Sequence, residues 1–120
     1  MKVIFNPLLS ASLVTVMMLS LPSCSAWYSD QILDNREHGL SCEALPAPEE
    51  VKQVLAEQQE LVQEIEAVHP GHVFVEVDEH TCPDRANIVI AYPSHQDREK
   101  IEALLQSDTF FGVPYRLRNQ

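Results

Sequence analysis

Residues 72–92 read HVFVEVDEHTCPDRANIVIAY and decide the fold of this chain. Two apolar runs, Val73–Val77 and Ala86–Tyr92, flank a polar loop that carries Cys82. Runs of this length, rich in β-branched residues, are typical of strands. The loop is too long for a two-residue turn. We therefore predict a β-hairpin with a long loop, and the apolar surface of this hairpin is the surface that the flanking helices need to cover.

The first strand of this hairpin has two different faces. Side chains alternate across a strand, so the valines share one face. The opposite face holds His72, Phe74, Glu76 and Asp78. If Val89 or Tyr115 also lies on that side of the sheet, a shallow apolar patch with acidic neighbours results, and contiguous patches of this kind mark partner surfaces. Phe74, Glu76 and Asp78 are thus the predicted partner-binding face; the alternative is that another segment of the chain covers them.

A helix is expected on each side of the hairpin. Apolar residues recur at helical intervals from Glu49 to Val68, after Pro48 and before Pro70-Gly71. A second helix is expected from His95 to about Gln106. Ser94 is its predicted N-cap, with its hydroxyl accepting from a backbone amide of the first turn.

The C-terminal segment is expected to complete the sheet. Phe110-Phe111-Gly112 is predicted to be an aromatic loop that fills the core, and Val113–Leu117 the last strand. The order helix, strand, strand, helix, strand predicts an α+β two-layer sandwich in residues 48–120. It would have a small, mostly antiparallel three-stranded sheet with two helices on one face, and a parallel crossover between the second and third strands.

The N-terminus has the pattern of a secretion signal. Lys2 precedes an uncharged, apolar run from Val3 to Leu21, and small residues close that run. We expect residues 1–23 to be a cleaved signal peptide. The alternative is a retained transmembrane helix, since about 20 apolar residues span a bilayer.

Leu21-Pro22-Ser23-Cys24 resembles the lipobox of bacterial lipoprotein precursors. The resemblance covers these four residues, and Pro22 departs from the usual pattern. It implies lipid attachment at Cys24, cleavage before it, and, with Ser25 following, delivery to the outer membrane on its periplasmic side. The alternative is ordinary signal cleavage after Ala26, which would give a soluble periplasmic or secreted protein.

The segment after Cys24 has no sustained periodicity. Residues 24–47 are expected to be a tether, with turn-forming residues throughout. Within it, Trp27, Tyr28, Ile32 and Leu33 are suited to a short turn at the membrane interface, where aromatic rings are favoured. The alternative is that these four side chains fold back onto the domain.

The chain has three cysteines, an odd number. Lipidation of Cys24 would leave Cys42 and Cys82, and thiols in an oxidising envelope pair. We therefore predict a Cys42–Cys82 disulfide between the tether and the hairpin loop. Such a link would enclose about 40 residues and contribute on the order of 4 kcal/mol.

The hairpin carries residues suited to two other chemistries. His72, Glu76, Asp78 and His80 offer nitrogen and oxygen donors for a divalent metal such as zinc or copper. Cys82 with His80 and Asp84 is the only local nucleophilic trio, but the members of such sites are normally assembled by the fold. Neither set of residues matches a specific metal-binding or catalytic motif, so we predict no enzyme and no resident metal.

The overall charge restricts the partners further. The formal net charge is −10, from 18 Asp and Glu against 8 Lys and Arg, which disfavours nucleic acid. The chain has three glycines and no glycine-rich phosphate loop, so no cofactor is expected. The sequence predicts a small acidic envelope lipoprotein whose stapled domain binds an unidentified envelope protein. The alternative is a soluble secreted or periplasmic protein that binds divalent metal.

Overall fold

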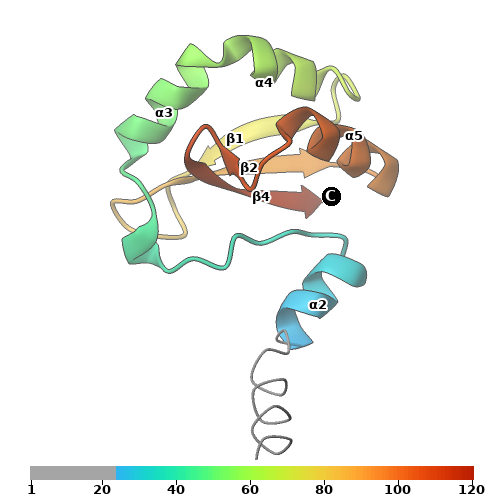
Figure 1. The fold of residues 1–120 in the computed structure, drawn as a ribbon, viewed down its shortest axis with the longest axis horizontal. Coiled ribbons are helices and arrows are strands. Elements are labelled where there is room, and N and C mark those ends of the chain that lie inside the picture. Colours follow the sequence, from blue (N-terminus) through green and yellow to red (C-terminus); the bar gives the residue numbers. More distant parts are fainter. Residues whose placement is uncertain (1–23) are drawn as a thin grey trace, which may run out of the picture.

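The computed structural model describes residues 24–120, so the predicted signal peptide lies outside the described residues. The domain is α+β, as predicted, with helices packed against a single sheet (Figure 1). Its elements in chain order are α2 (Cys24–Gln31), η2 (Cys42–Ala44), α3 (Pro48–Glu57), α4 (Gln59–Glu66), β1 (Phe74–Asp78), β2 (Asn87–Tyr92), α5 (His95–Leu105), β3 (Thr109–Phe110) and β4 (Val113–Asn119).

The sheet has four strands in the order β1-β2-β4-β3. β1 and β2 form the predicted antiparallel hairpin, and β2 and β4 are parallel neighbours joined through α5. The expected three-stranded, mostly antiparallel sheet is wrong in detail, because the sheet is mixed and β3 adds a fourth strand.

β3 arises where an aromatic loop was expected. Phe111 and Gly112 both have positive φ, 50° and 87°, and this pair turns the chain so that Phe110 lies opposite Val113. Two-residue hairpin turns with positive φ at both positions usually have Asn or Asp before Gly. The Phe-Gly pair found here is therefore an unusual sequence for this turn. Phe110 is buried in the core as predicted, whereas Phe111 is 59% exposed and does not fill it.

The described residues form four α-helices rather than two. The helix expected from Glu49 to Val68 is interrupted at Gln58, which leaves α3 and α4. Val51 and Leu55 lie on the apolar face of the helix, and the next position on that face is residue 58, which is Gln. No buried apolar side chain therefore stabilises a continuous helix at this point. The Gln59 side chain donates to the Leu55 carbonyl at this break (3.2 Å).

The core lies between one face of the sheet and three helices. Ile88, Ile90 and Tyr92 of β2 are fully buried and alternate with residues of the opposite face. They pack with Val51 of α3, Ile65 of α4 and Ile101 of α5 in one cluster. Figure 1 shows α3 and α4 arching over the sheet with α5 beside them. We call this covered side the inner face and the other side the outer face.

The segment between α2 and α3 runs along the domain. Arg36 pairs with Leu117 of β4 in an antiparallel bridge, so it lies along the same edge of β4 as β3, nearer to the C-terminal end of that strand. Leu45 is buried, and the Pro46 carbonyl accepts from the Ala86 amide (3.0 Å). Residues 34–47, which were expected to belong to a tether, thus make defined contacts with the sheet.

β1 is the outermost strand at the other end of the sheet. The Val75 amide points away from β2, and the Glu66 carboxylate of α4 accepts its hydrogen bond (3.1 Å). A side chain of the neighbouring helix therefore occupies the middle of this edge.

Candidate functional site

The three predicted binding residues, Phe74, Glu76 and Asp78, lie together on the outer face of the sheet. Phe74 lies opposite Ala91, Glu76 opposite Val89, and Asp78 opposite Asn87. Because β4 is paired in parallel on the other side of β2, Arg116 lies beside Val89 and Arg118 beside Ala91. The outer face thus has an aromatic and acidic row on β1, a small apolar row on β2 and a basic row on β4.

The apolar part of this face is small but continuous. Phe74 is 45% exposed and Val89 is half-buried, with Ala91 between them. Tyr115, the other residue considered for the patch, is not part of it. The register places Tyr115 beside Ile88 on the inner face, where it is buried and its hydroxyl donates to the Ser107 carbonyl (2.7 Å).

Asp78 is a fixed part of the face. Arg116 Nη2 lies 2.7 Å from its carboxylate, and the Thr81 hydroxyl donates to it at 2.6 Å. Burial raises the pKa of the Asp78 carboxyl, but hydrogen bonds from the Thr81 hydroxyl and the His80 and Thr81 amides, with the Arg116 charge, outweigh burial and lower the pKa to about 2. Asp78 is therefore ionised at neutral pH and positions both Arg116 and the start of the hairpin loop.

Glu76 and Arg118 are the polar groups of this face that remain available. Both are exposed, and neither forms an ion pair with another described residue. A shallow groove of about 260 Å³ lies between them, and its floor includes Val89 and Arg116. The groove has an anionic side and a cationic side, and its lining is mostly polar, with Val77 and Val89 as the apolar residues. It is therefore suited to a charged ligand that also carries a small apolar group, such as a peptide segment.

Cys42 and Cys82 form the predicted disulfide, with their Cα atoms 5.5 Å apart. The link joins η2 to the loop between β1 and β2 and closes 40 residues. With its sulfur bonded to Cys42, Cys82 has no thiolate to act as a nucleophile with His80 and Asp84, or as a metal ligand.

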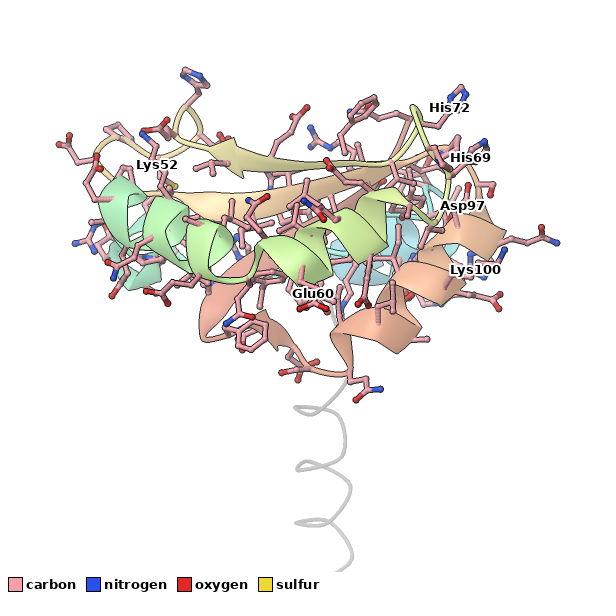
Figure 2. All side chains as sticks on the ribbon, turned by 90° about the horizontal axis from the view of Figure 1, so that it is seen from above. Lys52, Glu60, His69, His72, Asp97 and Lys100 are labelled. Atoms are coloured by element: carbon pink, nitrogen blue, oxygen red, sulfur yellow. A yellow bond between two sulfur atoms is a disulfide. The ribbon has the colours of Figure 1, made fainter. Side chains whose placement is uncertain are left out.

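The three histidines nearest the hairpin are divided between the two ends of β1. Figure 2 shows His69 and His72 together with Asp97 at one end of the molecule. Their rings are 4.5 Å apart, and His69 Nδ1 lies 2.9 Å from Asp97 Oδ2. This hydrogen bond lowers the pKa of Asp97. His80 follows the other end of β1.

The metal set considered from the sequence is not assembled. Asp78 is occupied by Arg116 and Thr81, and Glu76 is exposed on the outer face. Among residues 24–120, no group of three or more His, Cys, Asp or Glu side chains is placed to hold a metal ion. The set His72, Glu76, Asp78 and His80 therefore has no common centre in the fold.

A buried arginine on α5 was missed in the sequence. Arg98 is only 6% exposed and binds three carboxylates: Asp34 at 2.9 Å, Glu102 at 2.9 Å, and Asp30 of α2. Ser94 caps α5 as predicted, with its hydroxyl accepting from the Asp97 amide. Counting from Ile101 and Leu105, residue 98 falls on the buried stripe of α5, and this spacing is the signal that would have identified it.

No helix of the described part of the chain is both long enough and apolar enough to cross a bilayer. No family model matches the chain, and comparisons with curated proteins and with solved structures find no match either. The function is therefore argued from the residues and geometry given above.

Proposed function

We propose that this protein is a small acidic cell-envelope lipoprotein, anchored through Cys24, whose disulfide-stapled domain binds a protein partner at the outer face of its sheet. The proposal has two parts, an anchor and a binding face. The anchor is supported by the lipobox-like segment and by the pairing of the other two cysteines, which leaves Cys24 as the unpaired one of three.

One observation carries the binding face. The three helices α3, α4 and α5 all pack on the inner face, so the outer face presents Phe74 with Glu76 and Arg118 on either side of Val89. Exposed aromatic and arginine side chains are enriched in the energetically dominant parts of protein interfaces. The partner that fits is a protein segment with apolar side chains to contact Phe74 beside the groove and Val89 within it, and with charges complementary to Glu76 and Arg118.

Photocrosslinking in intact cells tests the binding face. A benzoylphenylalanine placed at Phe74 is expected to capture one discrete protein, and the same group at Phe111, also exposed but on the β3–β4 turn, should not. Phe74 contributes little to the core, so the substitution leaves folding largely unchanged. Glu76→Lys combined with Arg118→Glu should abolish capture by a crosslinker placed at Phe74.

Equal capture from both positions, or from the charge-reversed chain, would exclude this face as the specific binding site. Retention of the Cys42–Cys82 disulfide in every variant serves as the folding control, since non-reducing electrophoresis reports it directly.

A further inference from the structure

The segment that follows Cys24 exposes an unusual concentration of large apolar side chains. Seven such side chains are exposed in the described part of the chain, and four of them fall within residues 27–33. Trp27 and Ile32 are each 57% exposed, Tyr28 51% and Leu33 47%. We call these four residues the α2 patch. An aqueous setting disfavours such a cluster, whereas a bilayer interface favours it.

The α2 patch is exposed although its segment is firmly held. Asp30 and Asp34 bind Arg98 of α5, and the Tyr92 hydroxyl donates to the Asp34 carbonyl. The Asn119 amide donates to Asn35 Oδ1 (2.7 Å). The polar residues of this segment thus attach it to the domain, while about half of each apolar side chain stays exposed. Trp27 lies at a groove that it shares with Arg36 and Arg98.

Helix geometry places the two aromatic residues of the patch beside the proposed anchor, while Ile32 and Leu33 follow the end of α2. α2 begins at Cys24, and positions three and four residues further along a helix lie on the same face. Trp27 and Tyr28 occupy these positions. A membrane that holds position 24 therefore lies against the same side of α2 as both aromatic residues.

We propose that the α2 patch inserts into the interfacial layer of the lipid bilayer next to acylated Cys24 and, through the Arg98 ion pairs, holds the domain in a fixed orientation to the membrane. This inference rests on the proposed anchor and adds a second membrane contact to it. Tryptophan and tyrosine are the residues favoured at this depth, and apolar contact combined with an acyl chain gives more stable attachment than one signal alone. The strongly negative chain makes a zwitterionic lipid surface the expected target.

Fluorescence of the full mature protein tests this contact, because Trp27 is the only tryptophan. The acylated chain is reconstituted in phosphatidylcholine vesicles, and its emission is compared with that of the Cys24→Ser variant in buffer. We expect a shift to shorter wavelength, quenching by lipids brominated near the headgroup, and at least a several-fold loss of quenching by iodide. Ile32→Ser with Leu33→Ser should restore iodide quenching, while Phe111→Ser, the matched control, should not.

The result that overturns the contact is Trp27 equally quenched by iodide in vesicles and in buffer, with no quenching by brominated lipid. If the intact mass shows acyl chains and the chain sediments with vesicles, that result rejects the contact and leaves the anchor standing. A mass without acyl chains rejects the anchor itself. A Cys24→Ser variant that is dimeric in buffer, with Trp27 already shielded, would assign the patch to a second copy instead.

Discussion

Arg98 is the residue on which the attachment of α2 most depends. Its guanidinium lies among the carboxylates of Asp30, Asp34 and Glu102, and it is almost fully buried. Arg98→Met preserves much of the volume but removes the counter-charge that these three acids share, leaving Glu102 with Arg36 and Asp34 with His95. We expect a loss of about 3–5 kcal/mol in the free energy of unfolding, measured by urea denaturation. Arg118→Met, at an exposed arginine, is the control and should change stability by less than about 0.5 kcal/mol.

The Asp78 carboxylate should make the free energy of unfolding depend on pH in the acid range. Its folded-state pKa is lowered from 3.8 to about 2, so its contribution is fully present above pH 3.8 and is lost as the pH falls through about 2. Relative to Asp78→Asn, the native chain should lose about 2 kcal/mol over this range. Urea unfolding of both proteins at several pH values measures the difference. A constant gap between the two down to about pH 2 would show that the hydrogen bonds from Thr81 and His80, together with the Arg116 charge, do not stabilise the ionised Asp78 carboxylate in this way.

The disulfide is the element-scale feature with the largest expected effect. Closing a loop of 40 residues contributes on the order of 4 kcal/mol in the chain-entropy model. Replacing both Cys42 and Cys82 by Ser should therefore lower the unfolding temperature substantially, as measured by circular dichroism. The native chain in excess reductant should match the double variant. If reduction leaves the unfolding temperature unchanged, the contacts of Leu45 and Pro46 hold this segment without the link.

At the same scale, patterns within one segment predicted the structure better than contacts between segments. The cysteine pair was predicted from the odd number of cysteines, whereas the hairpin and the Ser94 cap followed from patterns within one segment. The break at Gln58 and the strand β3 did not, because each depends on how a segment fits the twisted sheet. The alternation of side chains along a strand predicted that Phe74, Glu76 and Asp78 share one face. The positions of Arg116 and Arg118 on that face could not be predicted, because they depend on the register between β2 and β4.

For the whole molecule, the proposed anchor predicts how the protein divides between membrane and aqueous fractions. The mature native chain should carry acyl chains on Cys24 in its intact mass and remain with the membranes. Cys24→Ala should move it to the aqueous fraction, while Cys42→Ser with Cys82→Ser should leave it membrane-bound. A Cys24→Ala chain that stays with membranes in high salt would contradict lipid anchoring.

The hydrogen bond from Val75 to Glu66 has a consequence for self-association. A sheet edge is a template on which another chain can add a strand, and β1 is the edge of this sheet that neither β3 nor Arg36 extends. A carboxylate on the central amide of β1 competes with an incoming backbone carbonyl and brings negative charge to the same place. This hydrogen bond makes the edge less favourable for cross-β growth. It would also oppose the aggregation that the proposed lipid anchor, by concentrating the protein at a membrane, would otherwise promote.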